Sequence, residues 1–357
     1  MLRLPPYVYH RPRSLAEALD FLAEHASDAL PIAGGTDLVP NMKHKLFTPA
    51  HLVALKGIEE LRGIAVRGGN GAGAPGGADR ESSGEGAGAP APGGYVRIGA
   101  GETLASVAAH PDVRGWLPSL AHAAGQVAGP QLRNAGTIGG NLCLDTRCTY
   151  YNQTRFWRTA LGFCLKKDGD VCHVTRVGRK CVAAQSADTP PVLATLGASL
   201  VLRSAEGERV LGVEDFFVAD GIANTVRRPG ELVIEVRVPL PSARTRTAYR
   251  KLRQRNSIDF PLLSVAAAGE VTEDGIVEDL RIVVSALGAR QKSLTGIDGI
   301  AVGRRLDADV IDALAERAFV QCHPLTNIIV DAEWRRAMVP VHVRRALEEL
   351  ELAPLSA

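Results

Sequence analysis

No stretch of this sequence approaches the roughly 18 consecutive apolar residues that a membrane-spanning helix needs, so we expect no segment that crosses a bilayer. The first residues also lack the apolar core of a secretory signal. An excess of charge of one sign is missing too, because 41 basic and 39 acidic residues leave a formal net charge of +2. That balance gives no electrostatic reason to expect nucleic acid or a membrane surface as a partner. We therefore expect a cytoplasmic protein, in which thiols stay reduced.

Cysteine is scarce outside one segment, since five of the six cysteines in the 357 residues lie between residues 141 and 181. There is no CxxC pair, so a zinc ribbon or finger fits poorly, and the common ferredoxin spacings are absent as well. Four of the thiols follow one another at intervals of 16, 8 and 9 residues: Cys148, Cys164, Cys172 and Cys181. Four thiolates suit an iron–sulfur cluster or a zinc ion, and spacing alone leaves chance clustering open. Cys322 is remote and is expected to be a small buried residue.

Large apolar residues are absent from residues 68–94, where 11 of the 27 positions are glycine, three are proline and alanine is the only apolar type. Such a segment cannot bury enough surface to offset the entropy lost on ordering. We predict a disordered insert between two strands, at 64–66 and 95–98. A functional loop is the alternative.

The rest of the chain has mixed α/β patterning. Ser14 and Glu17 form a capping box in front of a one-faced apolar pattern, which predicts a helix. Strands are predicted at 30–33, 52–55 and 231–240. In the last third strands precede amphipathic helices, which is typical of an α+β domain: strands at 264–269 and 279–285, helices at 307–318 and 341–352.

Two glycine-containing loops could bind a cofactor. Residues 31–38 read PIAGGTDL and residues 134–142 read NAGTIGGNL, so each combines glycines with a hydroxyl and a polar partner. Consecutive backbone N–H groups in such loops form concave nests that suit a diphosphate. Neither loop is a P-loop or a GxGxxG motif, so ordinary tight turns remain open. Residues 249–255, YRKLRQR, place cations near such a site or form a solvated strand face.

These pieces, in this order, resemble the flavin-binding medium subunit of the xanthine dehydrogenase family of molybdenum hydroxylases. The motifs that carry the resemblance span nearly the whole chain outside 68–94: AGGTDL (33–38), TIGGN (137–141), SADTPPVLATLGA (186–198) and YRKLRQRNSIDFP (249–261). The resemblance implies an α+β fold with a two-subdomain FAD-binding domain and a C-terminal α+β domain of the CO dehydrogenase flavoprotein type. The implied bounds are 1–57 and 58–240 for the two subdomains, and 241–357 for the C-terminal domain.

The cysteine segment narrows the resemblance to one branch of the family. NLCLDTRCTYYNQ (141–153), Trp157 and the cysteines that follow are similar to the β subunits of 4-hydroxybenzoyl-CoA reductases. Those subunits carry a 4Fe-4S cluster in an insertion of the flavin domain. The resemblance therefore implies a cluster-binding loop at 143–185, with Cys148, Cys164, Cys172 and Cys181 as ligands and Cys143 outside the ligand set.

The same resemblance implies the residues that bind FAD. One side of the diphosphate would be lined by Ile32, Ala33, Gly34, Gly35, Thr36, Asp37 and Leu38, and the other by Thr137, Gly140 and Asn141. Asp188 stands where the family has a carboxylate near the ribose and diphosphate. Val233 and Lys251 match positions near the isoalloxazine, and Val127 is a further cofactor-binding position.

The implied function is electron transfer, with no catalytic residue on this chain. Electrons from reduced ferredoxin would pass through the 4Fe-4S cluster and FAD to 2Fe-2S centres on a small partner subunit. They would then reach a molybdenum cofactor on a large subunit, where 4-hydroxybenzoyl-CoA would lose its phenolic hydroxyl to give benzoyl-CoA. The implied assembly is a dimer of heterotrimers.

Two alternatives stay open. One is the same subunit in an oxidative dehydrogenase for an aldehyde, a purine or another aromatic compound. The other is a zinc-stabilised binding module whose flavin site is empty.

Overall fold

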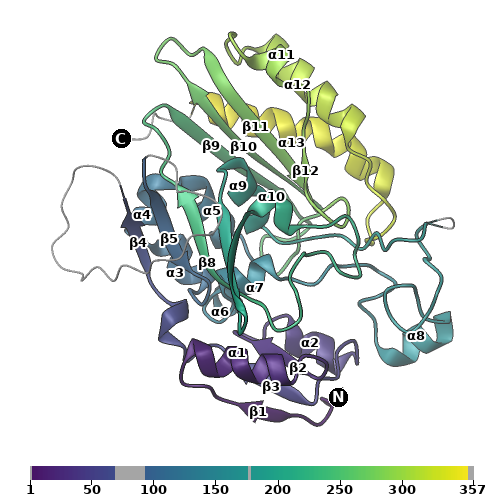
Figure 1. Ribbon diagram of the computed structural model, residues 1–357. Coiled ribbons are helices and arrows are strands. Elements are labelled where there is room, and N and C mark those ends of the chain that lie inside the picture. Colours follow the sequence, from purple (N-terminus) through teal and green to yellow (C-terminus); the bar gives the residue numbers. More distant parts are fainter. Residues whose placement is uncertain (1, 69–92, 176–177, 353–357) are drawn as a thin grey trace.

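Three sheets follow one another through the chain in the computed structural model, which describes residues 2–68, 93–175 and 178–352 (Figure 1). The architecture is the predicted mixed α+β fold, with a two-part flavoprotein-type domain and a C-terminal domain. The predicted disorder of the insert at 68–94 concerns residues that lie, apart from its edges, outside the described ranges. Within those ranges, no helix combines the length and the apolar character needed to cross a membrane.

The N-terminal sheet is parallel and has the order β1-β3-β2. Its strands are β1 (Val8–His10), β2 (Ala29–Ile32) and β3 (His51–Ala54). Helix α1 (Leu15–Glu24) begins as predicted, because the Ser14 hydroxyl accepts a hydrogen bond from the Glu17 backbone N–H at 3.2 Å. Its buried face packs in one core with β2 and β3. Helix α2 (Leu38–Lys43) follows β2, and a short 3₁₀ turn, η1 (Glu59–Leu61), leads to the second sheet.

The central sheet is antiparallel and has the order β4-β5-β8-β6-β7. Its strands are β4 (Ile64–Arg67), β5 (Tyr95–Gly99), β6 (Ser199–Ser204), β7 (Gly207–Gly212) and β8 (Leu232–Pro239). The two strands predicted on either side of the insert are therefore paired with each other. The helices of this unit are α3 (Leu104–Ala109), α4 (Pro111–Trp116), α5 (Pro118–Gly125), α6 (Pro130–Arg133), α7 (Ile138–Leu142), α9 (Thr189–Thr195) and α10 (Val213–Phe216).

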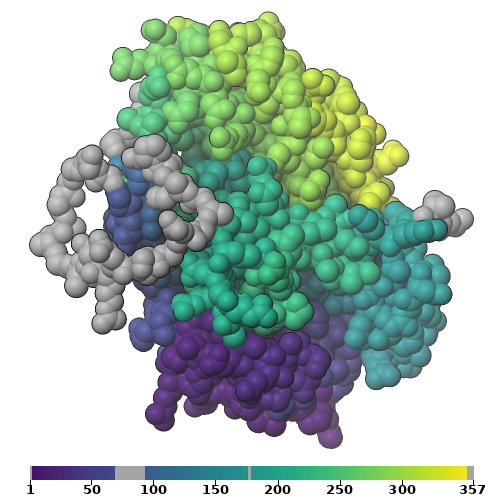
Figure 2. Space-filling view, viewed as in Figure 1, coloured from purple at the N-terminus to yellow at the C-terminus, as the bar shows by residue number. Residues whose placement is uncertain are grey.

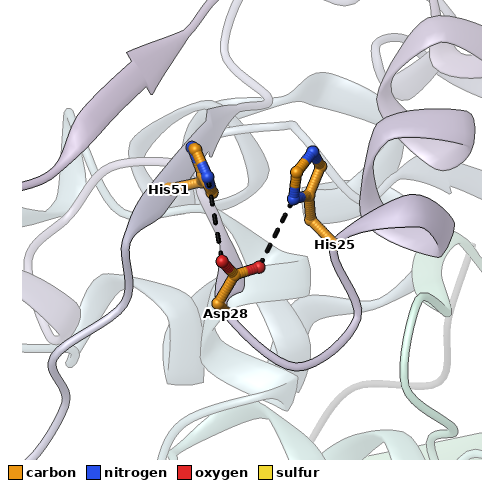
Figure 3. Close-up of side chains that lie close together, drawn as sticks. All are labelled: His25, Asp28 and His51. Atoms are coloured by element: carbon orange, nitrogen blue, oxygen red, sulfur yellow. Dashed lines mark ion pairs between the residues drawn. The ribbon is translucent and has the colours of Figure 1, made fainter.

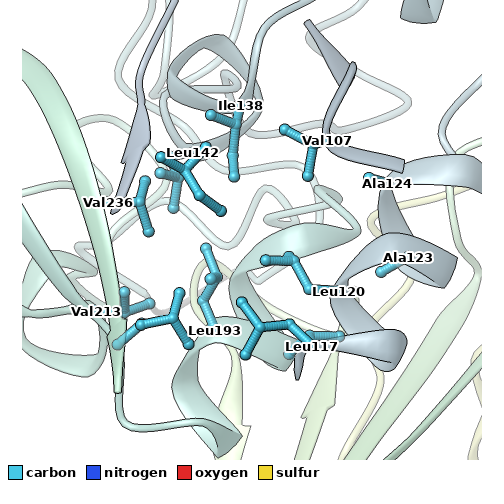
Figure 4. Packing of buried hydrophobic residues seen from close by; sticks show 14 of the residues in the cluster. Val107, Leu117, Leu120, Ala123, Ala124, Ile138, Leu142, Leu193, Val213 and Val236 are labelled. Atoms are coloured by element: carbon cyan, nitrogen blue, oxygen red, sulfur yellow. The ribbon is translucent and has the colours of Figure 1, made fainter. Parts of the chain in front are cut away.

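The core of this unit forms where the helices meet the sheet. Leu120 on α5, Leu142 on α7 and Leu193 on α9 point toward Val236 on β8, and all four are fully buried (Figure 4). Burying one such side chain contributes about 1.5–3 kcal/mol. The helix ends that carry the glycine loop at 134–142 are thereby held rigidly against the sheet.

The C-terminal sheet is antiparallel, in the order β12-β11-β10-β9. Its strands are β9 (Thr245–Leu252), β10 (Leu263–Val271), β11 (Val277–Ser285) and β12 (Lys292–Ser293), and its helices are α11 (Asp298–Ala301), α12 (Ala308–Gln321) and α13 (Ala332–Leu352). Helices α12 and α13 lie side by side over one face of the sheet (Figure 1). Cys322 is buried in their core, as predicted.

Helix α13 differs from its prediction. It was expected to begin at residue 341, after a proline, but it begins nine residues earlier and contains Pro340 in its interior. The tertiary core explains the difference, because Val339 and Val343, on either side of the proline, are both fully buried against the sheet. Packing therefore outweighs the local cost of the missing N–H.

The cysteine loop leaves the central unit after α7 and carries helix α8 (Arg155–Leu161) to the side of α2 (Figures 1 and 2). Arg158 fastens it there: its guanidinium is 1% exposed and donates to the carbonyls of His44 at 3.2 Å and Lys45 at 3.1 Å. It also pairs with Asp168 at 3.2 Å. The loop is thus bound to the N-terminal unit as well as to the unit from which it emerges.

Candidate functional site

The two glycine loops, about 100 residues apart in sequence, lie against each other in the fold. Residues 33–37 connect β2 to α2, and residues 134–137 lead into α7. A Cβ on Gly34 would lie 2.0 Å from the carbonyl oxygen of Ala135, so only glycine fits there. On the other side of the contact, a Cβ on Gly136 would lie 3.3 Å from the Thr36 hydroxyl oxygen. The structure therefore brings together backbone from both predicted diphosphate-binding segments.

Internal hydrogen bonds fix the second loop. The Thr137 hydroxyl accepts from the Gly140 backbone N–H at 3.0 Å and so caps α7. The buried Asn141 side-chain oxygen accepts from the hydroxyl and the backbone N–H of Thr189, at 2.7 and 3.2 Å. These bonds join α7 to the start of α9, next to Asp188.

Asp188 is at the centre of a buried charged group. Its carboxylate accepts a hydrogen bond from the Tyr249 hydroxyl at 2.6 Å, and the Lys251 ammonium lies 2.9 and 3.0 Å from its two oxygens. The Lys251 and Asp188 side chains are only 2% and 4% exposed. Burial raises the pKa of Asp188 and lowers the pKa of Lys251, in each case against the attraction of the partner. Both oxygens of Asp188 are thus engaged within the chain, and the residue holds Lys251 in place.

Lys251 connects this group to Val127 and its neighbours. Its ammonium also donates to the Gln126 carbonyl at 3.0 Å. Two residues further on, Ala128 contacts a second loop through Ile258. Ala128 and Ile258 have φ of +44° and +57°, and the Ile258 backbone N–H donates to the Ala128 carbonyl at 3.1 Å. A β-branched residue in the left-handed region is a true outlier, and such strain gathers where ligands are held.

Val233 is placed differently from the loop residues. It lies on β8 and is 7% exposed, within the core of the central unit. The same core contains Ile138 of the second glycine loop and Tyr249 beside Asp188. Its contribution is therefore packing beneath the site.

The four predicted ligand cysteines line one pocket. Its other walls are mainly aromatic and aliphatic and include Tyr151, Leu165 and Val182. Burial raises the pKa of the Cys148 thiol to about 11. Among these four described thiols, no three lie within 4.8 Å of one another. Cys143 is exposed and does not line the pocket.

Four charged side chains connect the first glycine loop to this pocket. Asp37, at the end of the first glycine loop, pairs with Arg147, the residue before Cys148. Asp145 pairs at 2.6 Å with Lys166, whose ammonium is 5% exposed and lies 4.3 Å from the centre of the Tyr151 ring. No sequence pattern predicts this group, because Asp37 and Arg147 are 110 residues apart. The only local signal was the alternation of acid and base just before Cys148.

Two family models match the chain. The model described as the FAD binding domain in molybdopterin dehydrogenase matches residues 5–73 and 89–241. The model described as the CO dehydrogenase flavoprotein C-terminal domain matches residues 247–350.

Individual proteins of the same kind are also similar to this chain. The chain is 27% identical to the carbon monoxide dehydrogenase medium chain of Hydrogenophaga pseudoflava over 96% of both chains. It is 32% identical to the FAD-binding subunit of an aldehyde oxidoreductase of Escherichia coli, over 73% of this chain and 76% of that one. Among solved structures, reconstituted CO dehydrogenase from Oligotropha carboxidovorans superposes with a TM-score of 0.74 and 26% identity, covering 98% of this chain and 99% of the other.

Proposed function

This chain belongs to the family of FAD-binding subunits of molybdopterin dehydrogenases, and from that membership we propose that it is an electron-transfer subunit holding a 4Fe-4S cluster beside its FAD. The observation that carries the proposal is the convergence of Cys148, Cys164, Cys172 and Cys181 on one pocket, from positions spread over 34 residues of chain. When bound, the two cofactors supply one- and two-electron chemistry, and the protein binds, orients and tunes them.

The donor set and the spacing of the thiols fit a cluster better than a single ion. A zinc ion with Zn–S bonds of about 2.3 Å would hold its four sulfurs about 3.8 Å apart. No three of the four thiols here come within 4.8 Å of one another, so the four are not gathered as a zinc ion would hold them. An iron–sulfur cube lies between its thiolates and needs the wider spacing. The walls of the pocket are mainly apolar, and Cys164 and Cys181 are buried in it.

The FAD diphosphate is proposed to lie along the contact between residues 32–38 and 137–141. Gly34 and Gly136 allow the two backbones to approach closely there. The Gly34 N–H is the proposed donor to a phosphate oxygen, whereas the Gly136 N–H already donates to the Leu132 carbonyl at 2.7 Å. The strained pair Ala128 and Ile258, with Lys251 beneath it, is proposed to border the ring of the flavin. Asp188 keeps the Lys251 ammonium in position for this role.

Lys166 is proposed to tune the cluster. It lines the thiol pocket. Burial raises the pKa of the Cys181 thiol, and the Lys166 charge acts against that shift. A nearby cation stabilises the more negative, reduced state of a cluster, so Lys166 raises its reduction potential. Asp145 opposes this effect on the potential, because it pairs with Lys166 and neutralises its charge. The pair of Arg147 with Asp37 continues the group of charges to the first glycine loop.

The finer assignment is a 4-hydroxybenzoyl-CoA reductase, with reduced ferredoxin as donor and molybdenum and 2Fe-2S subunits as partners in a dimer of heterotrimers. Its support is the similarity of residues 141–153 and the cysteine spacing that follows. The second candidate is the FAD subunit of an oxidative molybdenum hydroxylase. The relatives favour it, since their names describe a carbon monoxide dehydrogenase and an aldehyde oxidoreductase.

One variant tests the electron route, and the activity of the wild-type complex separates the two candidates. In the assembled complex, Cys164→Ser is expected to keep FAD but to lose reduction by ferredoxin, followed anaerobically as bleaching of the flavin absorbance. Cys143→Ser is the matched control, because that thiol is exposed and outside the pocket. Unchanged flavin reduction in Cys164→Ser would contradict the proposed route. Formation of benzoyl-CoA by the wild-type complex then supports the reductase, whereas aldehyde oxidation with a dye acceptor supports the second candidate.

A further inference from the structure

A cluster of imidazoles and a carboxylate lies on the N-terminal unit, outside both sites described above. His25 ends α1, Asp28 lies in the turn before β2 and His51 begins β3, and their side chains converge (Figure 3). His25 Nδ1 lies 3.4 Å from one Asp28 oxygen, and His51 Nε2 lies 3.8 Å from the other. One ligand atom from each of the three lies within 4.8 Å of the other two. We propose that these residues bind a divalent transition-metal ion of the zinc class.

The distances are close to those that such an ion requires. Zinc bonds of about 2.0–2.2 Å to nitrogen and oxygen place tetrahedral ligands about 3.3–3.5 Å apart. The His25–Asp28 separation already has that value. His51 Nε2 lies 3.8 Å from the other Asp28 oxygen, so a shared ion requires the His51 side chain to move closer. Two imidazoles with one carboxylate are a common ligand set for zinc, with a fourth position left for water.

The backbone holds the three ligands in place without a metal. The Asp28 carbonyl accepts from the His51 N–H at 3.1 Å, and the His25 carbonyl accepts from the Asp28 N–H at 3.1 Å. The His25 N–H itself donates to the Phe21 carbonyl at 3.0 Å. The site is therefore preorganised, and side chains that are 22–45% exposed leave a path for an ion.

A fourth imidazole orients the His51 ring. The distance between His10 Nε2 and His51 Nδ1 is 2.9 Å, on the side of the ring away from Asp28. If His51 Nδ1–H donates to His10, the lone pair of Nε2 faces the proposed ion, which is how ligand histidines are usually fixed. The Phe21 ring stacks on His25 at a centroid distance of 4.4 Å and packs on His10 at 4.1 Å. His10 is thus a positioning residue.

The surroundings favour a cation. The hollow that adjoins the cluster is lined by His10 and Phe21, by three acidic residues of α1, Glu17, Asp20 and Glu24, and by one cation, Arg11, so acidic groups outnumber basic ones. A bound ion would join the end of α1 to the start of β3 and would stabilise the parallel sheet. This role is independent of FAD and of the cysteine pocket, so neither proposal depends on the other.

Cobalt(II) alone is the probe, because tetrahedral cobalt has strong visible bands and thiolate ligands add a separate near-ultraviolet band. The full chain with its flavin is freed of loosely bound metal by chelation and titrated with cobalt under equilibrium dialysis. We expect one cobalt per chain with nitrogen and oxygen ligands, displaced by zinc. His25→Gln and Asp28→Asn should each lose this ion. The matched control is His323→Gln, which removes an exposed imidazole outside the cluster and should keep the ion.

His10→Phe should keep the stoichiometry and weaken cobalt affinity about 10- to 100-fold, as expected for a partner outside the ligand set. Flavin content shows that each variant is folded, and His51→Gln replaces any variant that loses its flavin. The same visible-band cobalt in His25→Gln, Asp28→Asn and the control would overturn the proposal. So would the absence of that band in the wild type at saturating cobalt.

Discussion

Removal of the Lys251 ammonium is expected to destabilise the protein strongly. The side chains of Lys251 and Asp188 are 2% and 4% exposed, and among the described residues the Tyr249 hydroxyl is the hydrogen-bond partner that the carboxylate would keep. Lys251→Met leaves a buried, incompletely paired charge, which costs about 3–5 kcal/mol. That is a large part of the roughly 5–15 kcal/mol by which a domain is stable.

The opposite result is expected when both charges are removed. Burial raises the pKa of Asp188 and lowers the pKa of Lys251, so desolvation outweighs their attraction in the folded state. The Asp188→Leu/Lys251→Met double variant should therefore be within about 1 kcal/mol of the wild type, or more stable. Its flavin content should fall nonetheless, because Lys251 is proposed to border the flavin.

The assay is urea unfolding followed by circular dichroism. It compares the wild type with Lys251→Met, Asp188→Leu and the double variant. The surface pair of Arg244 with Glu278 is the control, since both side chains are more than 40% exposed and Arg244→Met should cost less than about 1 kcal/mol. If Lys251→Met costs no more than Arg244→Met, the burial argument is wrong. A double variant as unstable as Lys251→Met would show that the unpaired charge is not the cause.

Three further predictions concern other parts of the chain. Gly34→Ala should abolish flavin binding because its Cβ would collide with the Ala135 carbonyl, whereas Gly115→Ala, which has open space around its Cβ, should keep a full flavin content by absorbance. Burial lowers the pKa of His342 to about 4, so the folded protein resists protonation of this side chain. The free energy of unfolding should therefore be fully present above pH 6.5 and should fall by about 2 kcal/mol between pH 6.5 and 4, after allowance for solvent screening. His342→Leu should remove that part of the pH dependence of the free energy of unfolding, and an unchanged acid slope would contradict it. Arg335→Lys should lower the free energy of unfolding in urea by at least about 2 kcal/mol. The buried guanidinium donates to three backbone carbonyls that a lysine cannot reach together. A loss within error of zero would refute this explanation.

Helices and strands can be predicted from the sequence where local chemistry determines them. The capping box at Ser14 placed the start of α1, and alternation identified β8. The predicted start of helix α13 at residue 341 is nine residues too late, because the burial of Val339 and Val343 on either side of Pro340 is a property of the assembled domain. Local signals therefore fail where tertiary packing overrides them.

The composition of the candidate site was readable, but its connections were not. Glycines at 34 and 136 and the cysteines from 148 to 181 are visible as patterns in the chain. The contact of Gly34 with Ala135 and the pairing of Asp37 with Arg147 join segments about 100 residues apart. No periodicity or motif links such positions. The same holds for His51, which reaches Asp28 only because β2 and β3 are neighbours in the sheet.

The most direct test of the electron-transfer proposal is iron and flavin analysis of the anaerobically purified chain, with an EPR spectrum after dithionite reduction. Four irons per flavin are expected for a 4Fe-4S cluster. The reduced-cluster signal should disappear in serine variants of Cys148, Cys164, Cys172 or Cys181 and persist in Cys143→Ser. Flavin without iron, or zinc in place of iron, would contradict the account.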